Sequence, residues 1–76
     1  MHYYKHYIDI NPEIRSGKPC IKGTRITVYD VLSYLAAGTG IEQLILDFPQ
    51  LSREAILACL SYSADAGNRY QAVFIS

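Results

Sequence analysis

A serine and an arginine stand at the start of a helical segment, directly after a short turn. Ser52 ends the turn 49–52, Arg53 follows it, and the apolar spacing on both sides predicts two helices. Two helices joined in this way match a helix-turn-helix unit, whose second helix presents its first residues to the DNA major groove. Arg53 could read guanine and Ser52 could contact a phosphate or a base edge. Many proteins that bind no DNA contain the same arrangement, and Glu54 beside the single arginine favours that alternative.

A second group of residues could hold phosphate. In the predicted β-hairpin, cations and hydroxyls together with backbone N–H groups can contact a phosphate backbone; these residues are Lys18, Lys22, Thr24, Arg25 and Thr27. A solvated polar edge would have the same composition, so both interpretations stay open. The candidate DNA contacts are therefore Lys18, Lys22, Thr24, Arg25, Ser52 and Arg53.

Patterns typical of catalysis or metal binding are incomplete. Gly17-Lys18 matches part of a phosphate-binding loop, but prolines replace its first glycine and its hydroxyl residue. His2 and His6 have ligand spacing on a helix without an evident third ligand, which favours a frayed terminus. Cys20 and Cys59 form no Cys-x-x-Cys pair and are interpreted as small buried apolar residues. We expect no enzyme activity, no cofactor and no metal.

Short extended segments are predicted in the N-terminal third. Residues 7–10 alternate between apolar and polar side chains and end at a turn signal, Asn11-Pro12. Residues 20–22 and 25–28 flank Gly23-Thr24, where a glycine can supply the positive φ of a tight bend. The sequence predicts a small β-hairpin or β-arch over residues 7–28.

Two helices follow. Thr27 is suited to be the N-cap of the first, with Asp30 in its first turn and Gly38 at its C-terminal end. This helix is predicted over residues 28–37, with an apolar face formed by Val28, Val31, Leu32 and Leu35. The same spacing recurs in Ile41, Leu44, Ile45 and Phe48, and Pro49 ends that second, short helix.

The third helix is predicted to run from Ser52, its N-cap, to about Ala66, where Gly67-Asn68 should break it. Its expected inner face comprises Ile56, Cys59, Leu60 and Ser63, and further apolar residues, Leu57, Ala58 and Tyr62, widen that face. Residues 67–76 are expected to form a short apolar tail with β character.

Size and charge limit the possible functions. The 76-residue chain allows one domain, which buries only about 60% of its unfolded surface, so a homodimer is the expected additional support. The net charge is zero, but residues 1–25 carry five basic and two acidic residues, and the excess of acids lies in residues 26–76. No apolar run approaches membrane-spanning length and the N-terminus lacks signal-peptide features, so a cytoplasmic protein is expected.

The stretch from Asn11 to Ile26, NPEIRSGKPCIKGTRI, closely resembles the signature of the family Domain of Unknown Function 433. The match continues through residues 27–35, Asp47-Phe48-Pro49 and Leu51-Ser52, and it covers roughly residues 7–66. This resemblance implies an α+β, mainly α fold, in which an N-terminal β element precedes a three-helix, homeodomain-like helix-turn-helix core. The chain is then a single domain, 1–76, with segments 7–28, 28–66 and 67–76.

The resemblance also implies a function. Members of the family are similar to Vap-type antitoxins, which suggests that this protein binds and neutralises a PIN-like ribonuclease toxin and could repress its own promoter by binding operator DNA. A non-DNA-binding dimerisation or adaptor module is the alternative. The tail could enter the acidic nuclease site through Arg69, Tyr70, Val73, Phe74 and Ile75. It could equally pair with the N-terminal strand, within one chain or across a dimer.

Overall fold

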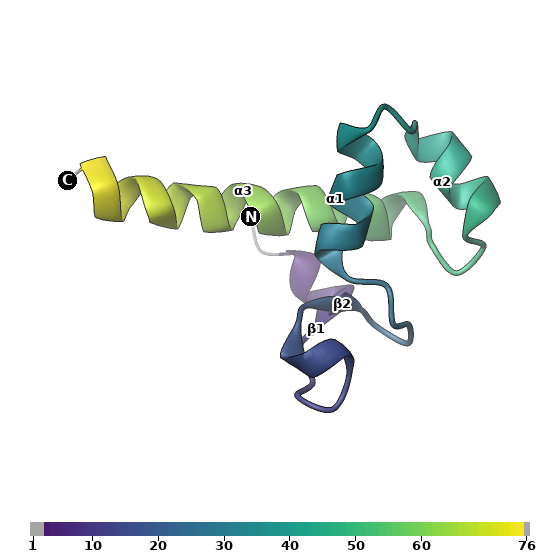
Figure 1. Ribbon diagram of the computed structural model, residues 1–76, viewed down its shortest axis with the longest axis horizontal. Coiled ribbons are helices and arrows are strands. Elements are labelled where there is room, and N and C mark those ends of the chain that lie inside the picture. The colour runs from purple at the N-terminus through teal and green to yellow at the C-terminus, as the bar shows by residue number, and fades with distance from the viewer. Residues whose placement is uncertain (1–2, 76) are drawn as a thin grey trace.

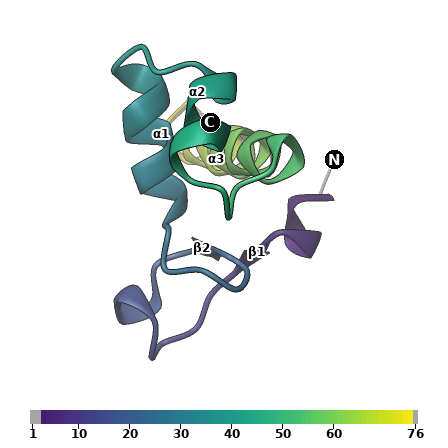
Figure 2. The ribbon, with the colours of Figure 1, turned by 90° about the vertical axis from the view of Figure 1, so that its right-hand side faces the viewer.

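A long C-terminal helix, α3 (Arg53–Ile75), is the centre of the fold, and every other element lies around its first half (Figure 1). The computed structural model describes the backbone of residues 3–75 and the side chains of residues 4–66. Viewed nearly along α3, helices α1 (Val28–Ala36) and α2 (Ile41–Asp47) lie to one side and above it, and the short strands lie below it (Figure 2). The fold is therefore α+β, and mainly α.

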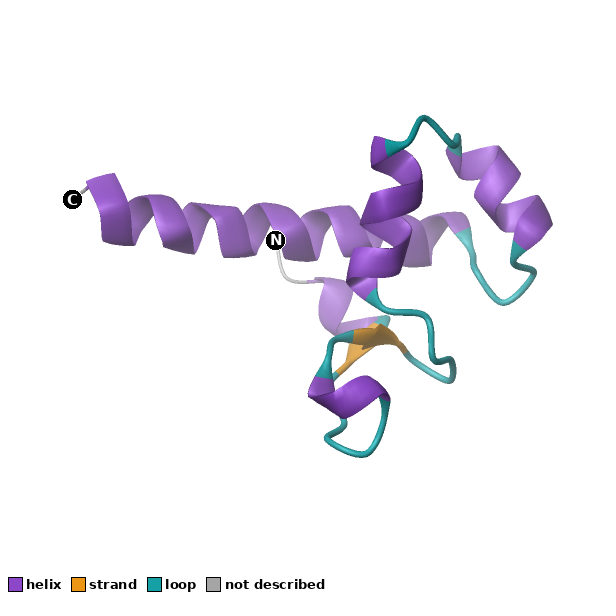
Figure 3. Ribbon diagram, in the orientation of Figure 1, coloured by secondary structure: helices purple, strands orange, loops and turns teal. Residues whose placement is uncertain are grey.

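The N-terminal third is a small β element with one 3-10 helix at Tyr3–His6 and one tight turn, η2 (Arg15–Gly17), whose φ values are positive (Figure 3). Strand β1 (Ile8–Asp9) pairs antiparallel with β2 (Cys20–Ile21), with Ile8 opposite Ile21. The predicted segment 25–28 forms no strand of its own, and it contacts β2 through an isolated bridge from Thr27 to Cys20. The predicted β element over 7–28 is thus present, but its main pairing joins the first and second predicted segments, 7–10 and 20–22, rather than the two segments beside Gly23-Thr24.

The start of the chain differs from the predicted frayed terminus. Residues Tyr3–His6 form a 3-10 helix, η1, that packs against α3. The Tyr4 side chain is buried, its ring meets that of Tyr62 edge to face at 5.5 Å, and its hydroxyl donates to Asp65 at 2.8 Å. An aromatic ring with a polar tip can bury its area and still satisfy its hydroxyl, which is why this terminal tyrosine is part of the core.

Helix α1 begins as the sequence predicts. The Thr27 hydroxyl accepts from the Asp30 backbone N–H at 2.9 Å, and the Asp30 carboxylate accepts from the Thr27 N–H at 3.0 Å, a complete capping box. The helix ends at Ala36, one residue before the predicted end, and Gly38 follows with a φ of 97°.

Helix α2, the turn and the start of α3 form the predicted helix-turn-helix. The turn is closed by the Leu51 N–H, which donates to the Phe48 carbonyl at 2.8 Å. The Ser52 hydroxyl accepts from the Ala55 N–H at 3.1 Å, as expected of the N-cap of α3. Leu51 itself is buried, so the turn is anchored to the core.

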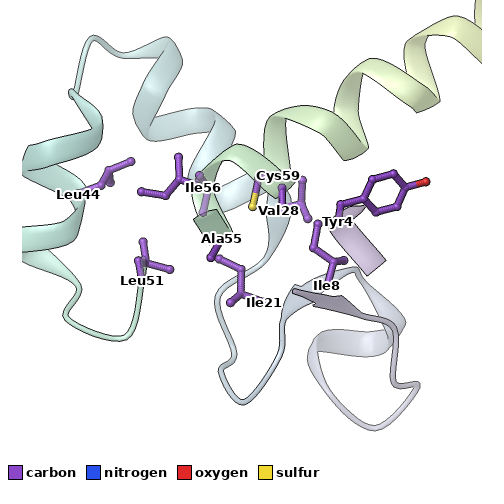
Figure 4. Packing of buried hydrophobic residues seen from close by; sticks show 11 residues of the cluster. Tyr4, Ile8, Ile21, Val28, Leu44, Leu51, Ala55, Ile56 and Cys59 are labelled. Carbon is purple, nitrogen blue, oxygen red and sulfur yellow. The ribbon is translucent and has the colours of Figure 1, made fainter. Parts of the chain in front are cut away.

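The hydrophobic core lies where α3 meets the other elements (Figure 4). Figure 4 shows Ile56 and Leu44 facing each other between α3 and α2, and Ile8 and Ile21 reaching α3 from the strands. The buried set also contains Tyr4, Val28, Val31, Leu51, Ala55, Ala58 and Cys59.

Three predictions for the C-terminal part of the chain are wrong. The helix does not end near Ala66 but continues through Gly67-Asn68 to Ile75, because one glycine inside a helix costs only about 1 kcal/mol relative to alanine. The predicted β tail 67–76 is thus helical as far as residue 75. Leu60 and Ser63, expected on the inner face, are exposed, whereas Ala55 and Ala58 are buried. Small alanines let α3 approach its neighbours closely.

Candidate functional site

The predicted DNA-reading residues open α3, and both already have partners within the helix-turn-helix. Ser52 Oγ holds the first turn of α3 as its cap. The guanidinium of Arg53 pairs with the carboxylate of Glu42 on α2, and the two side chains are 52% and 73% exposed. An exposed ion pair of this kind is worth at most about 1 kcal/mol, so a phosphate or a guanine could displace Glu42.

Two leucines are exposed on α3 in the turns that follow Arg53. Leu57 and Leu60 lie one and two turns after Arg53, and each is exposed over more than a third of its surface. A helix that reads bases needs hydrogen-bond donors and acceptors in these positions, whereas leucines suit a protein surface. Glu54, which is also exposed, adds a negative charge to the same end of the helix.

The β element and its connecting turns carry three exposed positive charges. Lys18, Lys22 and Arg25 are exposed, and none of them forms an ion pair within residues 4–66. Lys18, Lys22 and Thr24 line one shallow hollow, together with Asp9, Asn11, Ile14, Cys20, Ile21 and Gly23. The structure thus brings three of the five predicted phosphate contacts to one place, whereas Thr27 is buried as the cap of α1 and cannot contact a phosphate. We call Lys18, Lys22, Thr24 and Arg25 the cationic platform.

The hydroxyl of Thr24 has a structural role inside this platform. It donates to the Ile21 carbonyl at 2.8 Å and accepts from the Ile26 N–H at 3.0 Å. Gly23 beside it has a φ of 78°, a conformation that side chains other than glycine rarely adopt. The turn that carries Lys22 and Arg25 is therefore held in one shape.

Arg15 fastens the platform to α1, a role that the sequence analysis did not predict. Its Nη1 donates to the Arg25 carbonyl at 2.9 Å and to Asp30 Oδ2 at 3.2 Å. The backbone before the platform passes through three consecutive positive φ values: 49° at Arg15, 59° at Ser16 and 81° at Gly17. Two of these residues are not glycine, so the conformation is strained and must be stabilised by such contacts.

The hydrogen bond from the Thr27 backbone is the main cause that lowers the pKa of Asp30 below its usual 3.8, and the nearby Arg15 guanidinium adds to this effect. Partial burial acts in the opposite direction. Asp30 is therefore a carboxylate at neutral pH, and its charge holds together the cap of α1 and the arginine that supports the platform.

The predicted toxin contacts lie on the last turns of α3. The backbone of Arg69, Tyr70, Val73, Phe74 and Ile75 is helical, and this half of α3 extends away from the other elements (Figure 1). Their side chains lie outside the described residues. The predicted pairing of this segment with the N-terminal strand, within one chain, does not fit a helix that leaves the globule.

Residues 4–66 contain no group of three His, Cys, Asp or Glu side chains placed to hold a metal ion, and His2 lies outside them. Burial raises the pKa of the Cys59 thiol to about 12, so this cysteine is not a reactive nucleophile. No helix within the described residues is both long and apolar enough to cross a membrane.

The fold defines a small α+β domain in which a β element supports a helix-turn-helix. The chain belongs to the family described as "Protein of unknown function (DUF433)", whose model matches residues 8–63. It is also similar to "Uncharacterized protein y4eO" of Sinorhizobium fredii (strain NBRC 101917 / NGR234), with 34% identity over 59 residues. The alignment covers 78% of this chain but only 27% of that relative.

A solved structure supports the fold. The crystal structure of a DUF433 member protein from Anabaena variabilis ATCC 29413 matches this chain with a TM-score of 0.76 and 25% sequence identity. The match covers 91% of this chain and 68% of that one. The predicted family and fold class are thereby confirmed.

Proposed function

We propose that this protein is the antitoxin of a type II toxin–antitoxin pair, which binds and neutralises a PIN-like ribonuclease and represses its own promoter. The observation that carries the proposal is the second half of α3, which extends beyond the globule (Figure 1). A helix that leaves its own core can place an apolar face in a groove of another protein. In sequence, this half carries Tyr70, Val73 and Phe74 together with one cation, Arg69.

The cation suits the proposed partner. PIN-like nucleases bind catalytic metal ions through carboxylates, and an arginine that enters such a site would compete with the metal. The apolar residues would supply the buried anchors, and Arg69 would supply the charge that blocks catalysis. Neutralisation thus requires binding alone, with no reaction performed by this chain.

Operator binding is the second half of the proposal. The cations of the cationic platform, which form no ion pair with the described side chains 4–66, would contact phosphates. Arg53 at the start of α3 would contact bases after releasing Glu42. Phosphate contacts position the protein and make its affinity strongly dependent on salt. Few side chains at the start of α3 could contact bases, so we expect modest sequence specificity.

A specific observation favours the alternative, an adaptor module that binds proteins and no DNA. Arg53 is engaged by Glu42, and the outer face of α3 presents Leu57 and Leu60 rather than polar side chains. In that case the helix-turn-helix would serve only as a scaffold for protein contacts.

Co-expression with the product of the adjacent gene tests the first half. We expect a stable complex by size-exclusion chromatography and loss of ribonuclease activity in that complex. Phe74→Asp should weaken the complex, whereas Gln71→Asp, which adds the same charge to the same helix, should weaken it less. No complex, or equal effects of both variants, would contradict the proposed use of α3.

A promoter-fragment mobility shift across a salt series tests the second half. Lys22→Ala should weaken binding to all sequences and reduce the salt slope by about one, and the charge-conserving Lys22→Arg should bind nearly as the original. Arg53→Ala should cost about 1–3 kcal/mol and relax specificity. If the protein forms the nuclease complex but shifts no promoter fragment, the antitoxin function stands and the proposed operator binding is refuted. The helix-turn-helix would then serve protein contacts, as in the adaptor alternative.

A further inference from the structure

A groove runs between the N-terminal segment and α3, away from the helix-turn-helix. Its walls are formed by η1 and β1 on one side and by the α3 residue Tyr62 on the other. Its volume is about 760 Å³, counted with the part that is open to solvent. The lining residues are Tyr4, Lys5, Ile8, Asp9, Ile10 and Tyr62.

The floor of the groove is apolar and firmly held. Tyr4 and Ile8 are buried (Figure 4). The Tyr4 ring is fixed by its edge-to-face contact with Tyr62 and its hydrogen bond to Asp65. An apolar groove whose walls are already ordered loses little conformational entropy when it binds another surface.

An apolar residue stands at the edge of this groove. Ile10 directly follows β1 and is 58% exposed, whereas Ile8, two residues before it, is buried in the core. The molecule therefore carries a projecting apolar side chain and an apolar hollow side by side. Two copies related by a two-fold axis could fill both features at once, because the same patch is used twice in such a contact.

The rim of the groove carries one charge of each sign. Lys5 and Asp9 are both exposed, and they form no ion pair within residues 4–66. When such a rim meets its own copy in an antiparallel arrangement, each lysine can face the aspartate of the other molecule. The rim is thus complementary in charge to itself, which favours a second copy over a partner of uniform charge.

Strand β1 also has a second edge. In the described part of the chain it pairs with β2 alone, and a two-stranded sheet of this length is marginally stable in water. A second molecule packed along β1 would shield the backbone N–H and C=O groups of this edge from solvent.

We propose that a second copy of this chain binds in this groove, with Ile10 of each molecule in the groove of the other and with Lys5 facing Asp9 across the two-fold axis. The proposal concerns self-association and does not rest on the proposed antitoxin function. It assigns the dimer contact to the N-terminal segment, so the first turns of α3 that carry Ser52 and Arg53 stay accessible.

Sedimentation equilibrium over a range of protein concentrations tests the assignment. Ile10→Asp should raise the dimer dissociation constant at least about tenfold, because it places a charge in an apolar contact. Leu46→Asp is the matched control: Leu46 is 74% exposed on α2, and the same substitution there should leave the constant unchanged. Circular dichroism checks that both variants are folded.

A charge exchange tests the two-fold geometry itself. Lys5→Asp and Asp9→Lys should each weaken the dimer, and the double variant should recover it, because the opposite charges then face each other in reverse order. Recovery supports the proposal. A chain that is monomeric at all concentrations, a dimer unaffected by Ile10→Asp, or a double variant no better than the single ones overturns it. Loss of nuclease binding in Ile10→Asp, without an effect on self-association, would also overturn it and assign the groove to the nuclease.

Discussion

Asp30→Asn is the most informative single change for the stability of the platform. The Asp30 carboxylate accepts from the Thr27 N–H at 3.0 Å and from Arg15 Nη1 at 3.2 Å, so one charge joins the cap of α1 to the arginine that holds the Arg25 carbonyl. Asparagine has the same shape but no charge, and its amide group would repel the guanidinium if it faced it. The change therefore removes the electrostatic part of both contacts and leaves the packing intact.

The size of the effect follows from these two contacts. A capping interaction is worth about 1 kcal/mol, and a hydrogen bond to a charged group is worth about 1.5–3 kcal/mol when it is buried. The Asp30 side chain is 40% exposed, so solvent screens much of the second contribution. We expect Asp30→Asn to lower the free energy of unfolding by about 1 kcal/mol, which for a domain of this size lowers Tm by roughly 4–8 °C.

The effect should depend on pH in one direction. The pKa of Asp30 is lower in the folded protein than its usual 3.8, so the unfolded chain binds the proton more readily. The advantage of the original protein over Asp30→Asn is then fully present above pH 3.8. It should disappear as the pH falls below that value and through the folded-state pKa.

Thermal unfolding followed by circular dichroism, at neutral pH and at several acidic values, measures both quantities. Asp47→Asn is the matched control, because the Asp47 carboxylate accepts only from Gln43 on the exposed side of α2 among the hydrogen bonds of the described residues. Its Tm should change by less than about 2 °C. The reasoning is refuted if Asp30→Asn is as stable as the original at neutral pH, or if the difference between the two proteins grows as the pH falls.

Three further predictions concern the core, the thiol and the helix-turn-helix. Ile56→Ala, at a fully buried position, should cost about 2–5 kcal/mol in urea unfolding, whereas Leu46→Ala, at the 74% exposed position, should cost less than about 0.5 kcal/mol. Cys59 should resist alkylation by iodoacetamide at mildly alkaline pH and react once urea unfolds the protein, as mass spectrometry of its peptide would detect, because its folded pKa is about 12. Glu42→Gln should change the free energy of unfolding by less than about 1 kcal/mol and increase promoter affinity by freeing Arg53; unchanged affinity would mean that the ion pair does not restrain that arginine.

Local signals in the sequence predicted the helical part of the fold well. Thr27 and Asp30 form the capping box, and Ser52 caps α3, because each contact joins residues three positions apart and depends on residue type alone. The start of α1 and the stop of α2 before Pro49 follow from similarly short-range rules.

Contacts between distant residues could not be predicted in the same way. Tyr4 bonds to Asp65 across 61 positions, and nothing near Tyr4 in sequence distinguishes it from a solvated terminal tyrosine. In the sequence Arg15 is one of five basic residues in positions 1–25, and nothing marks it as a structural residue, because its partners become neighbours only after the strained turn 15–17 has formed. At Gly67-Asn68 a local signal predicted a helix end that is absent. The cost of one glycine inside a helix is too small to end α3 there.

The candidate site shows the same difference between features set by nearby residues and features set by distant ones. Of the residues that the sequence groups as phosphate contacts, Lys18, Lys22 and Thr24 line one hollow, whereas Arg25 does not. The sequence could not show that Arg53 would be engaged by Glu42, since that pair depends on the angle between α2 and α3. Nor did it indicate the groove beside Ile10, which exists only because η1 folds back on α3.

The central position of α3 affects how the chain can fold during synthesis. The ribosome releases η1, the strands, α1 and α2 before α3, yet the buried residues of these elements meet one another mainly through α3. Until α3 has been made, Tyr4, Ile8 and Leu44 have no complete core to enter, so the nascent chain exposes apolar surface. Folding is then a single late event rather than a stepwise one, and the interval before it is the period in which chaperones or proteases can act on this chain.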